Sequence, residues 1–200
     1  MRMTKALSLI ALTALASTAA VAQKTAVQSI EEYRAMLQDG NPADLFEAKG
    51  EDLWKQKRGP RNASLEKCDL GKGPGVVKGA FVELPRYFAD TRRVQDLESR
   101  LLTCMENLQG LDAAQIVKTP FGKGEQNNMT ALATWISAES KGMKFNLSQA
   151  HPAEKTFYEV GKRLFFQRGG PHDFSCASCH GQDNTRIRLQ DLPNLTKNPG

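Results

Sequence analysis

The sequence is poor in the features that mark membrane-spanning, nucleic-acid-binding and β-sheet proteins. After residue 22, no run of apolar residues approaches the roughly 18 that a spanning helix needs, so we expect no membrane span. The 27 Lys and Arg and the 22 Asp and Glu leave a formal charge of only +5, and they are scattered, which argues against a nucleic-acid partner. No stretch of four or more residues alternates apolar and polar side chains convincingly, so we expect a mainly α fold.

The one long apolar run lies at the N-terminus, where residues 1–22 have the pattern of an export signal. Arg2 and Lys5 precede an apolar segment at 6–16, and Ala20-Val21-Ala22 offers a small-x-small cleavage site. The segment is short for a bilayer span, so a retained anchor is the weaker alternative. We expect a mature periplasmic chain with a formal charge of +3, because the signal holds two basic and no acidic residues.

Cysteine is scarce, and all four cysteines follow the signal. Cys176 and Cys179 form a C-x-x-C pair, which leaves Cys68 and Cys104 as an even pair. Disulfides persist outside the cytoplasm, and a bond across this 36-residue separation would contribute roughly 3–4 kcal/mol in the chain-entropy model. We expect a Cys68–Cys104 disulfide; the alternative is two unrelated buried thiols.

The sequence Cys176-Ala177-Ser178-Cys179-His180 is the C-x-x-C-H signature of haem c attachment. Two thiols three residues apart on the first turn of a helix can reach the two vinyl groups of one porphyrin as thioethers. The adjacent histidine then ligates the iron. A thioredoxin-like redox pair needs no following histidine. Half of a zinc site would need further ligands at short spacing, and no Cys, His or Glu follows His180. We predict one covalent haem c.

The second axial ligand of the haem iron has no clear candidate. Electron-carrying cytochromes often use a methionine after the motif, but the last one, Met143, precedes it. His151 and His172 are weak alternatives, because we expect them at a helix entry and in a solvated loop. Only 20 residues follow His180, too few to wrap a haem, so we expect the sequence to stop inside the haem domain. The alternative is a partner that covers the haem.

Two parts of the chain resemble each other at an offset of about 108 residues, which indicates an internal repeat. The alternative is chance similarity among Gly, Pro and Leu. The offset aligns Cys68-Asp69-Leu70-Gly71-Lys72 with Cys176–His180, and Leu84-Pro85 with Leu192-Pro193. The upstream sequences Gly50-x-x-Leu53-Trp54 and Arg58-Gly59-Pro60 parallel Gly161-x-x-Leu164-Phe165 and Arg168-Gly169-Gly170-Pro171 with a small gap. We therefore expect two tandem cytochrome c-like units, a haem-free one at 23–149 and an incomplete haem c-binding one at 150–200.

The first unit has lost its haem motif, because Gly71 and Lys72 replace the second cysteine and the histidine. The same offset projects a counterpart of Cys104 to about position 212, beyond Gly200. A cysteine there would place a thiolate at the iron, which lowers the potential and suits sulfur chemistry better than general electron transfer.

Apolar periodicity predicts helices of ordinary length and no sheet. Cys104 falls on the apolar face of its predicted helix and should point inward. The predicted helices cover residues 28–38, 43–55, 91–108, 126–138 and 152–167.

Together, the export signal, the haem-free unit with a cysteine pair and the single C-x-x-C-H resemble SoxA, the haem subunit of the SoxAX cytochrome of thiosulfate oxidation. Pro85–Thr91, Leu102-Thr103-Cys104 and Cys68–Gly75 resemble the family's first unit, and Phe165–Gly169 with Cys176–Gly181 resemble its second. The resemblance spans about residues 28–200 and is closest to the single-haem branch.

The resemblance implies an L-cysteine S-thiosulfotransferase that joins thiosulfate oxidatively to a cysteine of the carrier SoxYZ and passes two electrons through haem. It implies a monohaem SoxX as partner, and a catalytic cysteine with a nearby arginine, both expected beyond Gly200. A simple periplasmic electron-transfer cytochrome is the main alternative and predicts a methionine there. A dihaem peroxidase would need a second C-x-x-C-H, and a purely structural module would not need the motif at Cys176–His180.

Overall fold

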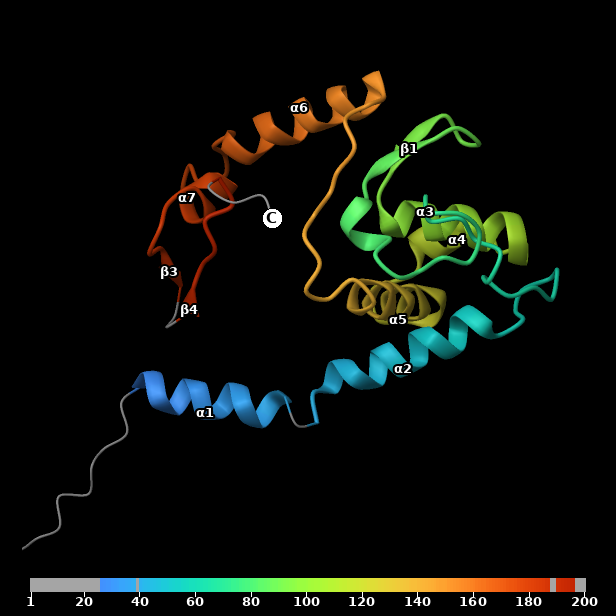
Figure 1. The fold of residues 1–200 in the computed structure, drawn as a ribbon, viewed down its shortest axis with the longest axis horizontal. Coiled ribbons are helices and arrows are strands. Elements are labelled where there is room, and N and C mark those ends of the chain that lie inside the picture. Colours follow the sequence, from blue (N-terminus) through green and yellow to red (C-terminus); the bar gives the residue numbers. More distant parts are fainter. Residues whose placement is uncertain (1–25, 39, 188–189, 197–200) are drawn as a thin grey trace, which may run out of the picture. The chain divides into compact units, whose positions relative to one another are not determined.

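The computed structural model describes residues 26–38, 40–187 and 190–196 (Figure 1). The predicted signal, residues 1–22, lies outside them. By internal contacts the chain divides into two parts, residues 1–41 and 42–200. The first part contributes helix α1, Ala26–Gln38, which confirms the helix predicted at 28–38. Among the described residues, no helix combines the length and apolar character that a bilayer crossing requires.

The second part is mainly helical, as the sequence predicts. Its strands are only two or three residues long and pair as two separate antiparallel ribbons, β1 with β2 and β3 with β4. The elements in chain order are α2 Pro42–Lys55, η1 Phe81–Glu83, β1 Arg86–Phe88, β2 Arg93–Gln95, α3 Leu97–Cys104, the π-helical η2 Met105–Gln109, α4 Ala113–Lys118, α5 Gly124–Ala138, α6 Pro152–Phe166, α7 Cys176–His180, β3 Arg186–Ile187 and β4 Gln190–Asp191.

The helix predicted at 91–108 is wrong at its start. Residues 93–95 form strand β2 instead, and α3 begins only after Asp96, whose carboxylate accepts a hydrogen bond from the Ser99 N–H at 2.8 Å. This is a helix N-cap, which satisfies a backbone donor that the first turn leaves unpaired. Pairing with β1 therefore overrides a helical pattern that continues through the sequence of β2.

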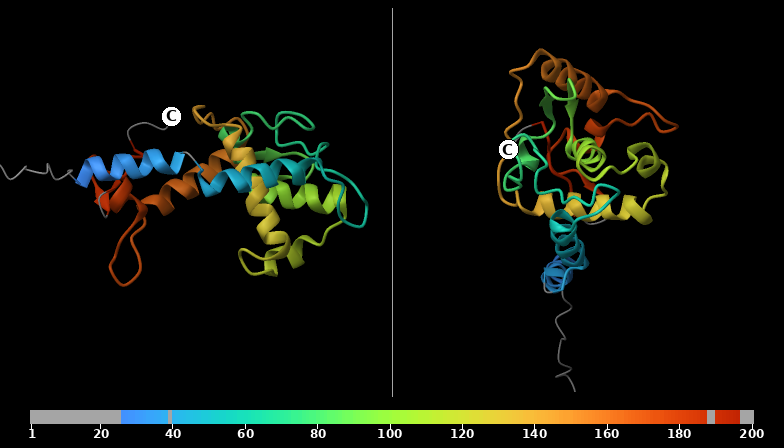
Figure 2. Two further views of the ribbon diagram at one scale, coloured as in Figure 1. Left: turned by 90° about the horizontal axis from the view of Figure 1, so that it is seen from below. Right: turned by 90° about the vertical axis from the view of Figure 1, so that its right-hand side faces the viewer.

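Helices α2 and α5 pack across each other in the second part (Figure 2). Gly50 makes the crossing possible, because a Cβ there would lie against the carbonyl oxygen of Ala131 and 2.7 Å from Cβ of Trp135. The ring centroids of Trp54 and Trp135 are 5.8 Å apart beside it. The largest fully buried apolar side chains of the same core are Leu65, Leu70, Leu101, Met105, Leu132 and Ile136. The core thus lies between 50 and 138, before the haem motif.

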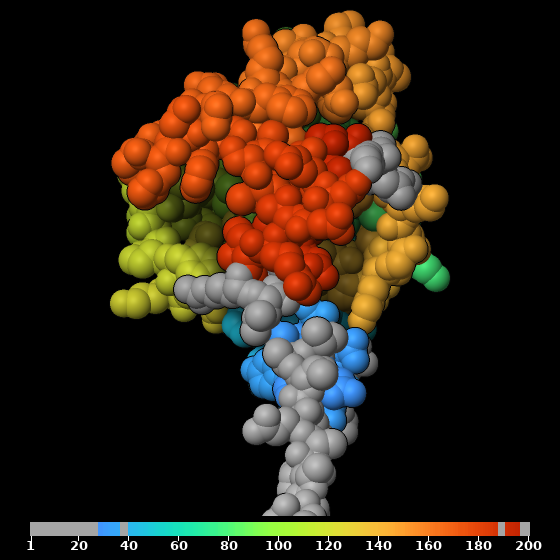
Figure 3. Space-filling view, turned by 90° about the vertical axis from the view of Figure 1, so that its left-hand side faces the viewer, coloured from blue at the N-terminus to red at the C-terminus, as the bar shows by residue number. Residues whose placement is uncertain are grey.

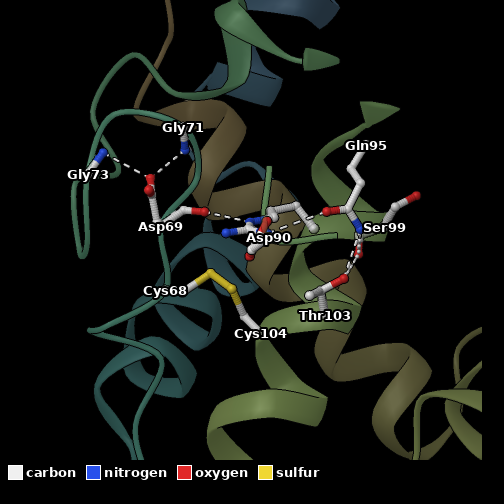
Figure 4. The surroundings of a disulfide bond; sticks show 10 residues. Cys68, Asp69, Gly71, Gly73, Asp90, Gln95, Ser99, Thr103 and Cys104 are labelled. Atoms are coloured by element: carbon white, nitrogen blue, oxygen red, sulfur yellow. Dashed lines mark hydrogen bonds and ion pairs between the residues drawn. A yellow bond between two sulfur atoms is a disulfide. The ribbon is translucent and has the colours of Figure 1, made fainter. Parts of the chain in front are cut away.

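The predicted disulfide is present and joins the loop after α2 to the last residue of α3 (Figure 4). The sulfur atoms of Cys68 and Cys104 are 2.07 Å apart, and both residues are buried, so Cys104 points inward as predicted. The adjacent Asp69 carboxylate accepts hydrogen bonds from the N–H groups of Gly71 and Gly73 at 2.7 and 2.9 Å. At residues 69–73, where the expected repeat would place the rest of a haem motif, the chain is therefore a tight loop closed by Asp69.

A buried arginine ties this loop to the hairpin of β1 and β2. The Arg100 guanidinium donates to the carbonyl of Asp69 at 2.6 Å and to the carboxylate of Asp90 at 2.7 Å. It also lies 4.0 Å from the ring centroid of Phe88, within cation–π range. The charge of Arg100 is thus fully compensated although only 6% of its side chain is exposed.

Candidate haem-binding site

The haem motif forms its own short helix, α7, which Ser175 starts. The Ser175 hydroxyl accepts a hydrogen bond from the Ser178 N–H at 3.2 Å, and the Ser175 N–H donates to the Ser178 hydroxyl at 3.0 Å. This reciprocal capping box fixes the first turn of the helix. Cys176 and Cys179 therefore lie three residues apart on one helical face, as the motif predicts.

The two thiols of the motif are free and accessible. Neither is in a disulfide; Cys176 is exposed and Cys179 is half-buried. Two unbonded thiols on one helical face suit double thioether attachment to a single porphyrin, whereas a thioredoxin-like pair would begin a long helix after a strand. Helix α7 has only five residues and follows a tight turn. The structure therefore fits the haem interpretation of the motif better than the redox-pair alternative.

The His180 ring is oriented by the loop that follows it. Its Nδ1 lies 3.1 Å from the carbonyl oxygen of Pro193, and the N–H of Leu195 donates to the His180 carbonyl at 2.9 Å. A carbonyl oxygen only accepts, so Nδ1 carries the proton and Nε2 keeps its lone pair for a metal. Metal-ligating histidines use this arrangement, in which the second nitrogen donates to a carbonyl.

Large apolar side chains remain exposed on α6 and around α7. An exposed apolar set of this size marks a surface that a ligand or further protein covers. Figure 3 shows the surface of residues 152–187 and 190–196 from one side. The exposed residues are Phe157, Tyr158, Val160, Leu164, Phe166, Phe174, Ile187 and Leu195. The motif, the free Nε2 of His180 and this apolar surface together fit a porphyrin.

Helix α6, which leads to the site, begins with a buried carboxylate. Glu154 is 6% exposed and accepts hydrogen bonds from the Tyr87 N–H at 2.8 Å, the His151 N–H at 3.1 Å and the Ser148 hydroxyl at 2.8 Å. Burial alone would raise the pKa of Glu154, but these hydrogen bonds, with the charge of Arg86, lower it below its ordinary value. Glu154 thereby fastens α6 to strand β1.

The other two histidines have the places expected of them. His151 is the N-cap of α6, where its Nδ1 accepts from the Ala153 N–H at 3.1 Å and its ring stacks on Tyr87 with centroids 3.6 Å apart. His172 is exposed in the turn before α7, and its ring centroid lies 6.0 Å from that of Phe174. The weaker alternative of either as an iron ligand gains no support from these positions.

Sequence reasoning missed the buried Glu154 and the role of the loop after the motif. A capping box usually begins with Ser, Thr, Asp or Asn, so His151 three residues before Glu154 did not stand out. In the sequence, Leu192-Pro193 indicates only the expected repeat, although the proline carbonyl is the hydrogen-bond acceptor for His180. The available signal is that Pro85 and Pro193 lie at the same distance, 17 residues, after Cys68 and Cys176.

Comparison with known proteins adds independent evidence. The SoxA/TsdA cytochrome c domain model matches residues 49–145, a range that ends before the C-x-x-C-H motif. The L-cysteine S-thiosulfotransferase subunit SoxA of Hydrogenophilus thermoluteolus is 56% identical over 174 residues, 87% of this chain and 64% of the relative. A SoxA subunit of Hydrogenobacter thermophilus is 34% identical over 152 residues, 76% of this chain and 55% of the relative.

A solved structure agrees with these relatives. The crystal structure of SoxXA from P. pantotrophus matches with a TM-score of 0.64 and 27% identity, over 82% of this chain and 59% of the matched chain. The chain thus spans less than two thirds of the length of each of these proteins. The resemblance found in the sequence is confirmed: residues 49–145 match the SoxA/TsdA cytochrome c domain, and 87% of the chain is similar to a SoxA subunit at 56% identity.

Proposed function

We propose that this chain is part of a periplasmic L-cysteine S-thiosulfotransferase. In the reaction, a carrier-protein cysteine thiol and thiosulfate become a cysteine S-thiosulfonate, with release of one proton and two electrons. The carrier would be a SoxYZ-like protein, and a SoxX-like monohaem cytochrome would be the partner subunit. The proposal is supported by the 56% identity to a SoxA subunit together with the C-x-x-C-H motif that this chain retains.

The proposal includes one covalent haem c, held by thioethers at Cys176 and Cys179 with His180 as an axial ligand. The observation that carries it is the orientation of His180, whose Nδ1 is engaged by Pro193 while Nε2 is left for iron. Bound there, haem c would accept electrons one at a time. Residues of this chain would hold and orient it: α7 presents the thiols, and the Pro193 carbonyl orients the imidazole ring.

The proposal also treats 23–149 and 150–200 as tandem cytochrome c-like units, and two matching turns support it. Residues 58 and 63 exchange two backbone hydrogen bonds at 3.0 and 3.2 Å, and residues 169 and 174 do so at 3.0 and 3.2 Å. Each turn has a left-handed glycine, with φ of 69° at Gly59 and 74° at Gly170. Each also has a left-handed polar residue, with φ of 47° at Asn62 and 49° at Asp173.

The matching turns refine the register of the repeat. They differ by 111 residues, and the same offset pairs Gly50 with Gly161 and Ser64 with Ser175 without any gap. Cys68 then corresponds to Cys179, rather than to Cys176 as the offset of 108 suggested. Asp69 corresponds to the haem-ligating histidine position. The offset of 108 still relates Leu84-Pro85 to Leu192-Pro193, so the loop after the motif is three residues shorter in the second unit.

A direct test of the proposed activity uses the protein encoded by the complete gene, matured with haem and purified with its monohaem partner. Thiosulfate, a SoxYZ-like carrier and an oxidised electron acceptor are added, and the intact mass of the carrier is measured. Addition of one S-thiosulfonate group, with two electrons delivered per carrier, is expected. An electron-transfer cytochrome would pass electrons to the acceptor but leave the mass of the carrier unchanged.

A further inference from the structure

The carbonyl that orients His180 belongs to the peptide bond between Pro193 and Asn194, and the Asn194 side chain is held from two sides. Pro193 supplies the oxygen 3.1 Å from His180 Nδ1, and the nitrogen of the same peptide bond belongs to Asn194. Rotation of that peptide plane would turn the oxygen away from the ring. The groups that fix the plane therefore fix the strength of the hydrogen bond to His180.

The Asn194 side chain is the centre of this arrangement. Its Nδ2 donates to the Asp183 carboxylate at 2.8 Å, and its Oδ1 accepts from the N–H of Thr196 at 3.0 Å and from the hydroxyl of Thr196 at 2.7 Å. Asp183 lies three residues after His180, and Asn194 lies next to Pro193. The amide thus joins the start of the loop to its end, and the Leu195 N–H closes the loop on the His180 carbonyl at 2.9 Å.

We propose that Asn194, held by Asp183, is a positioning residue that sets the strength of the Pro193–His180 hydrogen bond. The inference rests on the proposed attachment of haem at Cys176–His180. A strong hydrogen bond from Nδ1 makes Nε2 a better electron donor to iron, which stabilises the oxidised state. Loss of the hydrogen bond between Asn194 and Asp183 therefore weakens the hydrogen bond from His180 Nδ1 to the Pro193 carbonyl. The haem midpoint potential then becomes more positive.

The same loop offers a matched control. Arg186 and Asp191 form an exposed ion pair between β3 and β4 with 2.5 Å between Nε and Oδ1. Its loss disturbs the hairpin, but neither side chain bonds to the peptide that faces His180 or to Asn194. Arg186→Gln therefore measures the effect of loosening the hairpin alone.

The test compares four variants of the haem-loaded protein: Asn194→Ala, Asn194→Asp, the exchange Asp183→Asn with Asn194→Asp, and Arg186→Gln. The Asn194→Asp side chain faces the Asp183 carboxylate and is repelled, whereas the exchange restores one amide and one carboxylate. Haem per chain is measured from the alkaline pyridine spectrum, and the midpoint potential by spectroelectrochemical titration. The first readout reports on the proposed haem attachment, and the second reports on the positioning role.

Both single variants at Asn194 should bind haem and show a more positive midpoint. At the wild-type midpoint their ratio of reduced to oxidised haem should be higher by a factor of up to about five, the value for complete loss of one hydrogen bond. The exchange should return the potential to that of wild type, and Arg186→Gln should not shift it. If a single variant at Asn194 fails to attach haem, the double variant Asp183→Asn with Asn194→Asp decides the matter. A wild-type amount of haem per chain in the double variant supports the proposal, and a double variant without haem overturns it.

Two further results would overturn the positioning role while leaving the proposed function intact. One is a wild-type midpoint in fully loaded Asn194→Ala, and the other is an equal shift in Arg186→Gln. Absence of haem from the wild-type chain would instead contradict the proposed haem attachment.

Discussion

Replacement of Glu154 by glutamine tests whether a single buried carboxylate fastens helix α6, which leads to the C-x-x-C-H motif, to strand β1. Glu154 is 6% exposed and accepts three hydrogen bonds, two of them from backbone N–H groups. Glutamine has one acceptor oxygen, so its NH₂ group must face either the Tyr87 N–H or the donors at His151 and Ser148. At least one buried donor then loses its partner, and the charge that strengthened the other bonds is gone.

The cost of that loss follows from ordinary hydrogen-bond energetics. A hydrogen bond to a charged group contributes about 1.5–3 kcal/mol, and an unpaired buried donor costs about 1–3 kcal/mol. We expect Glu154→Gln to lower the free energy of unfolding by about 2–4 kcal/mol at pH 7. Urea denaturation followed by circular dichroism measures it. Glu159→Gln is the matched control, because Glu159 lies on the same helix and is exposed.

The pH dependence has a definite sign. Because the pKa of Glu154 is lower in the folded chain than its ordinary value, its contribution is fully present above about pH 4.3 and is lost as pH falls through the folded pKa. The difference between wild type and Glu154→Gln should therefore shrink in acid below that value. A difference that is absent at pH 7, or that Glu159→Gln reproduces, would refute the reasoning.

Three further changes probe the fold around the site. Replacing both Cys68 and Cys104 by serine should lower the free energy of unfolding by roughly 3–4 kcal/mol, measured in urea without reductant; an unchanged midpoint would contradict a structural role of the disulfide. Gly50→Ala should destabilise by more than about 1 kcal/mol, because its Cβ meets the Ala131 carbonyl, and thermal melting would show the loss. Ser175→Ala should remove about 1 kcal/mol from the start of α7 and lower the yield of haem-loaded chain per total chain; equal yields would show that the cap is dispensable.

The sequence predicts those features of the fold that depend on local patterns. Apolar spacing is sufficient for α2, α5 and α6, and the C-x-x-C-H motif announces the candidate site by itself. The disulfide follows from counting, because Cys68 and Cys104 are the two cysteines that the motif leaves over. In each case the information lies within one segment or in the number of residues of one type.

Features that depend on distant partners could not be predicted. Residues 93–95 continue a helical pattern, yet they form a strand because residues 86–88 lie beside them. Glu154 is buried because Tyr87, 67 residues earlier, donates to it. The offset of the proposed repeat is also ambiguous in the sequence, because matching Cys68 to Cys176 gives 108, whereas the backbone of the two turns matches at 111.

We propose above all that this chain carries one haem, on Cys176 and Cys179, and none at residues 23–149. Trypsin digestion of the matured, non-reduced protein and mass spectrometry of the peptides test it most directly. The account predicts one haem on the peptide of residues 169–186, and a disulfide between the peptides of residues 68–72 and 101–118. Recovery of the 169–186 peptide without haem, with two thiols that react with iodoacetamide, would contradict it.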